Sequence, residues 1–265
     1  YDESMHNALL EQKGIEDSME DALSKHEFTV FYQPKFDITT GEIIGSEALV
    51  RWSRYSEIIP PVRFIPLFEE NGFIVPLDYY VLESVCASLR ARLDAGKKVL
   101  PVSVNFSRVH LSSDVLPVVV KATLERYNIS PGLIEIELTE SALASIEDYQ
   151  LNTLNELRSL GHVLTMDDFG SGMSSLNALR KLPFDVLKID REFLYSNSHS
   201  EREQIVLSNV VRMASDLNMK VICEGVETKE QEAFLKQIGC QFAQGFLYAR
   251  PLPEEQFIKE YLDLE

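Results

Sequence analysis

Apolar and polar positions along this chain follow two alternating patterns from about residue 77 onward. Segments in which apolar residues recur every three or four positions alternate with short, nearly continuous apolar runs. The first pattern is typical of amphipathic helices and the second of buried strands. Helices are expected at 77–93, 114–127, 146–160, 174–181, 201–217 and 229–238, each followed by a strand, at 99–104, 133–138, 163–166, 185–189, 220–223 and 241–243, and a last helix at 254–262 closes the chain.

The beginning of the chain is organised differently. Residues 5–27 have the apolar spacing of an amphipathic helix, and we interpret residues 1–27 as a lead-in helix. Two strands are expected at 28–33 and 43–50, and the sequence Thr-Thr-Gly at 39–41 predicts a turn between them. These two strands therefore form a hairpin, in which the first strand runs antiparallel to the second.

Eight strands that alternate with helices predict an α/β fold. Over about 250 residues, this pattern is typical of a TIM (β/α)8 barrel, in which the strands form an inner ring and the helices an outer layer. Because the first connection is a hairpin, we expect a modified TIM (β/α)8 barrel with the first strand antiparallel. No linker rich in Pro, Gly or Ser divides the chain, so residues 28–265 are expected to form one domain.

The balance of charge restricts the possible partners. The 265 residues include 25 Lys and Arg against 42 Asp and Glu, which gives a formal net charge of −17. Such a charge repels nucleic-acid polymers and anionic membranes, and we expect neither as a partner of this fragment. A small phosphorylated substrate is compatible with it, provided that metal ions or well-placed Arg and Lys side chains meet the negative charge.

The chain has no apolar stretch of the length that spans a bilayer. The apolar run at 115–120, for example, is interrupted by Pro117 and closed by Lys121. The sequence opens at Tyr1 without a signal segment, and we interpret it as a domain cut from a longer protein. We expect this domain in the cytoplasm, which is compatible with membrane tethering of the full-length protein.

The number and spacing of the cysteines and histidines indicate which kind of metal ion the chain could bind. The three cysteines, Cys86, Cys223 and Cys240, have no C-x-x-C spacing, and an odd number suits a reducing compartment. We interpret them as packing residues. The five histidines are scattered without an H-x-x-x-H pair, which argues against a zinc site. Any metal is therefore expected to be hard and oxygen-bound, such as Mg²⁺ or Mn²⁺.

Polar side chains occur at or near the ends of seven successive predicted strands. In a (β/α)8 barrel the active site lies at the C-terminal strand ends. Singly, each residue is best explained by a solvated sheet face or a loop. Jointly this explanation fails, because several carboxylates at one buried rim are costly unless they are paired or metal-bound. The set predicts a two-metal site with a base for water, and comprises Glu47, Asn105, Glu135, Glu137, Asp167, Asp168, Lys188, Asp190, Glu224 and Gln244.

The stretch 165–176, T-M-D-D-F-G-S-G-M-S-S-L, carries two adjacent acidic residues at the end of an apolar run. The glycines that follow Asp167 and Asp168 permit a tight loop. Acidic residues before glycine are also common in turns, so the stretch alone does not decide the matter. A kinase-type magnesium loop, suggested by D-F-G, is excluded because the chain has no glycine-rich strand-loop upstream and no H-R-D loop. The metal interpretation depends on the other strands.

Short motifs in a fixed order identify a family that the chain resembles. They are Y-Q-P (32–34), E-A-L-V-R-W (47–52), F-I-P-L-F-E-E-N-G (64–72), V-S-V-N-F-S (102–107), I-E-L-T-E-S (136–141), D-D-F-G-S-G (167–172), L-K-I-D (187–190), E-G-V-E-T (224–228) and Q-G-F (244–246). In this order they resemble the EAL domain family of cyclic-di-GMP phosphodiesterases, named for Glu-Ala-Leu. The resemblance covers about residues 28–262. Each motif alone is weak, but the ordered set is specific.

The resemblance implies a metal centre and a hydrolytic reaction. In this family Lys188 would position the attacking water and Glu224 would act as general base, and cyclic-di-GMP would be opened to linear 5′-pGpG. The implied ligands of two Mg²⁺ or Mn²⁺ ions, with Asp167 shared and Glu224 assisting, are Glu47, Asn105, Glu137, Asp167 and Asp168.

The resemblance also implies contacts to the substrate. Arg51 would bind a phosphate, Gln33 and Leu49 would line the substrate groove, and Pro253 would lie near a guanine. Residues that would orient the site or steady the loop at 165–176 are Asp190, Gln244, Glu227 and, for the loop, Glu140. The family further implies a homodimer and an upstream diguanylate cyclase (GGDEF) or sensor domain.

A few positions depart from the family pattern without removing a ligand. Met173 stands where Tyr is common, Ser171 replaces a frequent Thr, Phe246 replaces Tyr, and the segment 53–60 is short. These changes bear on the loop and its coupling to dimerisation. Two alternatives to a cyclic-di-GMP phosphodiesterase remain. One is a receptor that binds cyclic-di-GMP without hydrolysis, and the other is an unrelated barrel hydrolase for another phosphodiester.

Overall fold

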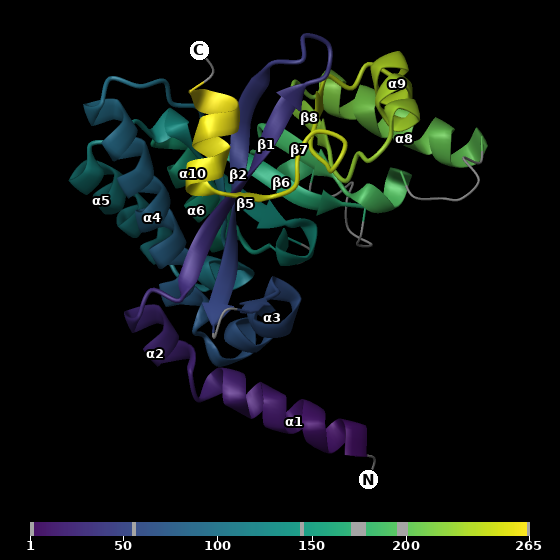
Figure 1. Ribbon diagram of the computed structural model, residues 1–265. Coiled ribbons are helices and arrows are strands. Elements are labelled where there is room, and N and C mark those ends of the chain that lie inside the picture. The colour runs from purple at the N-terminus through teal and green to yellow at the C-terminus, as the bar shows by residue number, and fades with distance from the viewer. Residues whose placement is uncertain (1–2, 55–56, 144–145, 171–178, 195–200, 264–265) are drawn as a thin grey trace.

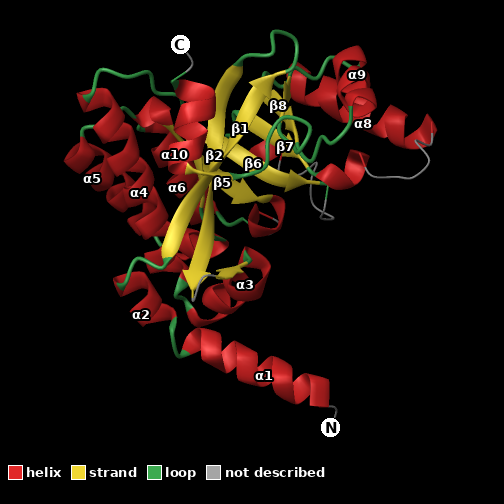
Figure 2. Ribbon diagram, in the orientation of Figure 1, coloured by secondary structure: helices red, strands yellow, loops and turns green. Residues whose placement is uncertain are grey.

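The predicted strands form a closed ring that is surrounded by helices (Figures 1 and 2). The computed structural model describes residues 3–54, 57–143, 146–170, 179–194 and 201–263. Around the ring the strands follow the order β1, β2, β4, β5, β6, β7, β8, β9, and β9 pairs with β1. They are β1 (Phe28–Asp37), β2 (Ile43–Arg54), β4 (Val102–Asn105), β5 (Ile134–Thr139), β6 (Val163–Phe169), β7 (Val186–Ile189), β8 (Lys220–Cys223) and β9 (Phe242–Ala243).

Strand β1 is antiparallel to both of its neighbours in the ring, β2 and β9. The other neighbouring pairs of the ring are parallel. The predicted modified TIM barrel with an antiparallel first strand is therefore confirmed. Two short strands that the sequence did not predict extend the sheet: β3 (Glu57–Ile59) pairs with β2, and β10 (Leu252–Pro253) pairs with β1.

The helices cover the outside of the ring (Figure 2). The predicted helix at 174–181 lies mostly outside the described residues. The closing helix is present but changes after Phe257 to a π-helix at Ile258–Leu262. The helices are α1 (Glu3–Glu16), α2 (Met19–Ser24), α3 (Pro61–Asn71), α4 (Ile74–Asp94), α5 (Val115–Tyr127), α6 (Asp148–Ser159), α8 (Glu201–Asp216), α9 (Lys229–Gln237) and α10 (Glu254–Phe257).

The alternation of β5 shows how the sequence separates core from site. Ile134, Ile136 and Leu138 are fully buried and belong to the same apolar cluster as residues of α6. Successive side chains of a strand point to opposite faces, so Glu135 and Glu137 point into the barrel instead. The outer face of this strand therefore stabilises the fold, while its inner face carries charge.

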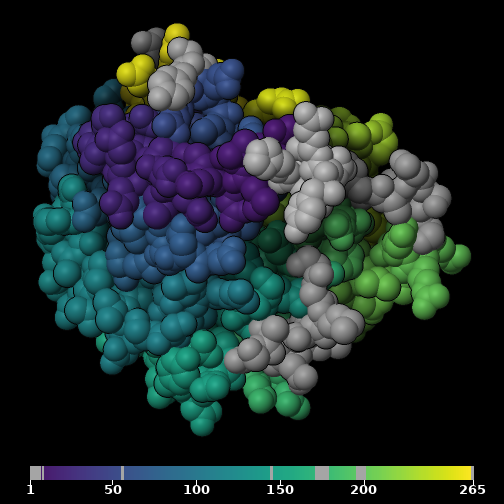
Figure 3. All heavy atoms as spheres, turned by 90° about the horizontal axis from the view of Figure 1, so that it is seen from below, coloured from purple at the N-terminus to yellow at the C-terminus, as the bar shows by residue number. Residues whose placement is uncertain are grey.

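The lead-in segment is two helices rather than the single helix predicted for 5–27. The hydroxyl of Ser18 donates to the carbonyls of Gly14 (2.6 Å) and Ile15 (3.2 Å), and α1 ends just before it. Hydroxyls that bond nearby carbonyls compete with continued helix. Buried Ile15 and Ala22 pack in a second apolar cluster with β2 and α3, and Figure 3 shows α1 lying across this end of the molecule.

The second cluster is aromatic. Its centre is Trp52, which is fully buried and lies 5.0 Å from the ring centre of Phe28 and within about 6 Å of Phe64 and Phe68. Phe64 and Phe68 lie one helical turn apart on α3, a helix that the sequence did not predict because it contains Pro66. Among the described residues, no helix is both long and apolar enough to cross a membrane.

Candidate active site

The ammonium group of Lys188, on β7, lies at the centre of the barrel mouth. Its Nζ atom is 2.7 Å from Glu224, 2.9 Å from Glu137, 3.0 Å from Asp167 and 3.1 Å from Glu47. The side chain of Lys188 is fully buried. Four carboxylates that were predicted from four different strands therefore meet around one lysine.

Two amides hold Glu47 in place from either side. Asn105 Nδ2 donates to Glu47 Oε1 (2.8 Å), and Gln244 Nε2 donates to Glu47 Oε2 (2.7 Å). Gln244 also donates to Gln33 Oε1 (3.0 Å), and Gln33 in turn donates to the carbonyl of Ala249 (3.0 Å). Hydrogen bonds of this kind fix the orientation of a buried carboxylate. Gln244, predicted to orient the site, thus contacts a predicted metal ligand directly.

The buried carboxylates differ in their acidity. Burial raises the pKa of Glu137 to about 7 and that of Asp167 to about 6, and it raises the pKa of Glu224 well above its usual value. Burial acts in the same direction on Glu47, but the charge of Lys188 and the two amide hydrogen bonds outweigh it and lower the pKa. Desolvation disfavours charged Lys188, yet the surrounding carboxylates hold its pKa well above the usual value.

A bulge in β6 brings two adjacent acidic residues to the same cavity. Side chains of consecutive strand residues normally point to opposite faces. The pairing of β6 with β7 shifts register between Met166 and Phe169, and Asp168 between them has a φ of 56°, in the left-handed region. Bulges of this kind re-aim side chains next to functional sites. Asp167 and Asp168 therefore both line the mouth of the barrel.

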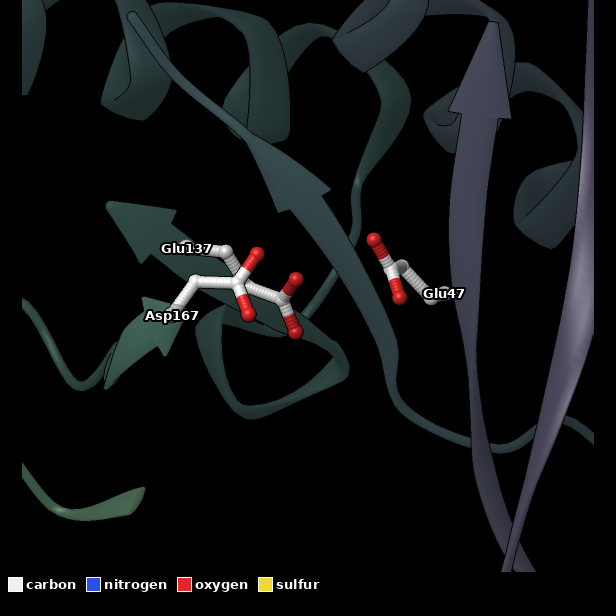
Figure 4. Close-up of side chains that lie close together, drawn as sticks. All are labelled: Glu47, Glu137 and Asp167. Atoms are coloured by element: carbon white, nitrogen blue, oxygen red, sulfur yellow. The ribbon is translucent and has the colours of Figure 1, made fainter. Parts of the chain in front are cut away.

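Two overlapping groups of carboxylates have the spacing of a metal site. One oxygen from each of Glu47, Glu137 and Asp167 lies within 4.8 Å of the others, and the same holds for Asp167, Asp168 and Glu224. Figure 4 shows the first group converging from β2, β5 and β6. Among the described residues Glu137 Oε1 is buried without a hydrogen-bond partner, although Lys35 Nζ lies 3.8 Å away, so this oxygen can accept a cation. The donor set is all oxygen and suits a hard divalent ion.

A cavity of about 400 Å³ opens above these carboxylates. Its size falls within the range of small-molecule sites. Four further residues line it that the predicted site did not include: Arg191, Gly225, Gly245 and Phe246. Of the predicted site residues, those that line it are Gln33, Glu47, Leu49, Asp167, Asp168, Asp190, Glu224, Glu227 and Gln244.

A second cavity of about 220 Å³ adjoins the first at Leu49, which lines both. Arg51 and Asn105 line it as well. Its polar wall was not predicted: Asp78 Oδ2 accepts from Ser107 N (2.9 Å) and pairs with His110 Nε2 (3.0 Å). The remaining wall is largely apolar, with residues of α3 and α4 such as Pro61, Ile65, Ile74 and Val81.

The predicted residues that lie outside the first cavity include Arg51, Glu140 and Pro253. The Arg51 guanidinium lines the second cavity and donates to the carbonyl of Val50 (2.8 Å). Glu140 is buried and accepts a hydrogen bond from Gly170 N (2.8 Å), at the start of the glycine-rich loop. Pro253 lies on β10 beside Phe31, is exposed and lines neither cavity, so its contact with a guanine stays a prediction.

A second buried lysine was missed by the sequence analysis. Lys35 of β1 contacts Glu135, lies 3.1 Å from Ser103 Oγ and is 3.8 Å from Glu137 Oε1. It follows Gln33 by two residues and so faces the same side of β1. The alternation of β1 places it on the inner face, but an active site at the C-terminal strand ends of a parallel barrel does not predict it, because β1 runs antiparallel to β2.

The family model described as "EAL domain" matches residues 16–251 of the chain. The chain belongs to the EAL domain family. The Glu-Ala-Leu signature thus stands on β2 of this EAL domain, with Glu47 beside Lys188 and Leu49 between the two cavities.

Curated relatives of this EAL domain are considerably longer proteins. It is 36% identical over 259 residues to the bifunctional diguanylate cyclase/cyclic di-GMP phosphodiesterase MucR of Pseudomonas aeruginosa. The alignment covers 97% of this chain and 38% of MucR. It is 39% identical over 251 residues to the cyclic di-GMP phosphodiesterase NbdA of the same organism, over 93% of this chain and 32% of NbdA. The chain therefore spans about a third of the length of these relatives.

Solved structures of the family have the same fold. A structure described as the PaMucR phosphodiesterase in complex with c-di-GMP superposes with a TM-score of 0.86 and 36% identity, over 92% of this chain and 99% of that one. The EAL enzyme Bd1971 in its cAMP- and cyclic-di-GMP-bound form gives a TM-score of 0.88 at 29% identity, over 95% and 69% of the two chains. The barrel is therefore that of EAL enzymes.

Proposed function

We propose that this EAL domain hydrolyses cyclic-di-GMP to linear 5′-pGpG and that it requires two divalent cations, Mg²⁺ or Mn²⁺. The observation that carries the proposal is the pair of carboxylate groups that share Asp167 at the base of the larger cavity. The curated names of MucR and NbdA, and the c-di-GMP complex of PaMucR, support the substrate.

The proposed ligands of the two ions are the residues predicted from the sequence. Glu47, Asn105 and Glu137 would hold the first ion, Asp168 the second, and Asp167 would bridge them. When bound, the ions would supply Lewis acidity, which neutralises a phosphodiester and makes water easier to deprotonate. The lack of a hydrogen bond to Glu137 Oε1 within the described residues and the shared position of Asp167 are the features of this chain that suit such a pair.

The protein residues would handle the proton and the attacking water. Lys188 Nζ lies 2.7 Å from Glu224 Oε1, so a water held by the ammonium would lie beside that carboxylate. Glu224 would accept the proton as the water oxygen attacks phosphorus, and the P–O3′ bond would break with protonation of the leaving 3′ oxygen. Burial raises the pKa of Glu224 and so disfavours the ionised form that a base needs, and the charge of Lys188 beside it opposes this effect.

The substrate would extend over both cavities. Leu49 separates them, and Arg51 in the second cavity would bind the phosphate that is not cleaved. A guanine carries two neighbouring N–H donors, which suits the acidic wall of the second cavity at Asp78 and Glu69. A homodimer, an upstream GGDEF or sensor domain and a cytoplasmic location stay predictions.

A metal-dependent hydrolysis assay tests the proposal. The purified chain is incubated with cyclic-di-GMP and Mn²⁺ or Mg²⁺, with EDTA in a parallel sample, and pGpG is quantified by chromatography. We expect Glu47→Ala to lower kcat by at least about 100-fold, beyond what loss of an outer-shell partner typically costs. Glu42→Ala removes an exposed carboxylate that immediately precedes β2, and this matched control should keep full activity.

Two results would contradict the proposal. Full turnover by Glu47→Ala would contradict the assignment of Glu47 as a metal ligand, and with it the proposed metal centre. Tight binding of cyclic-di-GMP without any product in either metal would identify the domain as a receptor rather than an enzyme.

A further inference from the structure

Two of the three cysteines lie in contact on the outer side of the barrel. Cys223 Sγ is 3.7 Å from Cys240 Sγ, and both side chains are buried, at 0% and 2% exposure. Cys223 is the last residue of β8, and Cys240 lies between α9 and β9. Cys86 lies on α4, which Figure 1 shows on the other side of the barrel from α9.

The backbone at Cys223 is connected directly to the proposed site. Cys223 precedes Glu224 in the chain, and its carbonyl accepts a hydrogen bond from Gln244 N (2.9 Å). Glu224 N in turn donates to the carbonyl of Ile189 (3.0 Å), one residue beyond Lys188. A displacement of Cys223 therefore reaches Glu224 and Gln244, whose side chains contact Lys188 and Glu47.

We propose that Cys223 and Cys240 are a modification site that takes a peroxide oxidant and forms a disulfide. A Cys240 thiolate attacks a peroxide oxygen, and the O–O bond breaks to give a sulfenic acid and, for hydrogen peroxide, one water after protonation. The Cys223 sulfur then attacks the sulfenic sulfur and expels a second water. The two thiols lose two electrons and two protons, and the peroxide is reduced to water.

Cys240 is the cysteine of the pair that the oxidant reaches first. It lies in a short turn whose flanking residues, Gly239 and Gln241, are both exposed, whereas Cys223 lies in the ring. Short turns open locally more readily than core strands. Movement of this turn would expose the Cys240 thiol to the oxidant. When the turn closes again, the oxidised Cys240 sulfur lies beside the sulfur of Cys223.

Closing the bond must move the chain. A disulfide has an S–S length of about 2.05 Å, so the two sulfurs have to approach by roughly 1.7 Å from their present 3.7 Å. Cys240 N donates a hydrogen bond to the carbonyl of Leu235 (2.9 Å), and this bond limits how far the turn can move. Misplacement of a reacting group by about 1 Å can cost about 100-fold in rate. We expect oxidation to lower the phosphodiesterase activity at least about tenfold, which rests on the proposed function.

The experiment measures the bond and the activity separately. The purified chain is treated with hydrogen peroxide, denatured in an alkylating agent and mapped by peptide mass spectrometry. We expect a linked pair of Cys223 and Cys240 peptides that is lighter by two hydrogens, with Cys86 alkylated as in untreated protein. Activity with Mn²⁺ should fall with formation of this link and return with dithiothreitol. Cys240→Ser and Cys240→Ala, either of which serves if the other folds poorly, should keep activity after peroxide.

Three results would overturn the inference. They are full alkylation of Cys223 and Cys240 after peroxide, preferential oxidation of Cys86, and an equal loss of activity in the Cys240 variants. If the untreated chain has no activity, the proposed function is overturned but the disulfide inference is not. The disulfide is detected by mass spectrometry, and its effect on the site can then be measured as a change in Mn²⁺ affinity.

Discussion

At the scale of single residues, the barrel mouth concentrates negative charge in a buried place. Lys188 contacts four carboxylates, and Lys35 contacts Glu135 and lies 3.8 Å from Glu137 Oε1. Buried carboxylates are stable only with compensating charge or with bound protons. The metal-free protein should therefore respond to pH in a way that the metal-loaded protein does not.

Glu137 gives this response a definite sign. Burial raises its pKa from 4.5 to about 7, so between these values the folded protein holds a proton that the unfolded chain releases. Its contribution to stability is present at low pH and is lost as pH rises through about 7. In EDTA, we expect wild type to lose on the order of 2 kcal/mol more than Glu137→Gln between pH 5 and pH 7.5, measured by urea unfolding. Identical pH slopes in the two proteins would contradict this assignment.

Gln244 is expected to act through Glu47. Because Gln244 Nε2 holds Glu47 Oε2 at 2.7 Å, its loss frees a proposed ligand without removing one. Outer partners of ligands typically change metal affinity about 10- to 100-fold. Gln244→Ala should weaken Mn²⁺ binding by such a factor in calorimetry, while Gln256→Ala, exposed on the last helix, should leave it unchanged. An unchanged affinity in Gln244→Ala would show that the hydrogen bond positions nothing.

Most residues of the site follow from the sequence because of a simple periodicity. Glu47, Glu137 and Lys188 stand on inward positions of parallel strands, and the period of two predicts that they meet. Lys35 was not predicted because β1 runs antiparallel to its neighbour, so its inward residues are not found by considering the C-terminal strand ends of a parallel barrel. The acidic wall at Asp78 escaped because it depends on how α4 packs on the loop after β4, which no local pattern encodes.

At the scale of elements, the bulge in β6 has an energetic signature. Non-glycine residues in the left-handed region are strained by about 1–2 kcal/mol, but Asn and Asp tolerate it. Asp168→Asn should keep the unfolding free energy, because it retains the backbone and removes a carboxylate whose pKa burial raises. Asp168→Val should be about 1–2 kcal/mol less stable than Asp168→Asn in urea unfolding. Both variants should lose activity, so activity does not distinguish them. Equal unfolding free energies of Asp168→Asn and Asp168→Val would argue against a strained backbone at this position.

The two lead-in helices should differ in their contribution to stability. The contacts of α1 include the exposed pair Glu11–Arg63, and exposed pairs contribute at most about 1 kcal/mol. Ile15, near the end of α1, and Ala22, on α2, are in contrast buried members of the second apolar cluster, and the cut after residue 14 leaves both in place. Removal of residues 1–14 should change the melting temperature by no more than about 2 °C, and removal of residues 1–25 should lower it by roughly 5–10 °C. Equal effects of the two truncations would place the stabilising contacts within residues 1–14.

Elements were predictable where periodicity and turn residues agree. The six repeating strands and most helices lie where the pattern placed them, whereas α3 is hidden by its internal proline and the lead-in helix is broken by Ser18. The bulge in β6 depends on pairing with β7 and on one unusual backbone angle. Such features arise from tertiary contacts, so a single sequence does not reveal them.

At the scale of the whole molecule, the net charge of −17 opposes the approach of an anionic substrate. Added salt screens this repulsion, since the Debye length falls from about 30 Å at 0.01 M to about 8 Å at 0.15 M. With saturating metal, kcat/KM for cyclic-di-GMP should therefore rise about two- to threefold over this range, while kcat stays constant. Steady-state kinetics in NaCl provide the measurement. A fall in kcat/KM would show that the local cations of the site, rather than the whole field, govern association.

The lysine at the centre of the mouth has a consequence for the order of assembly. Because Lys188 gives four converging carboxylates a shared counterion, we expect the barrel to fold without a bound ion. Folding and metal loading are then separate events, in contrast to small zinc domains that fold only around their metal. The supply of free divalent cation, rather than the yield of folding, would set how many molecules are active at a given moment.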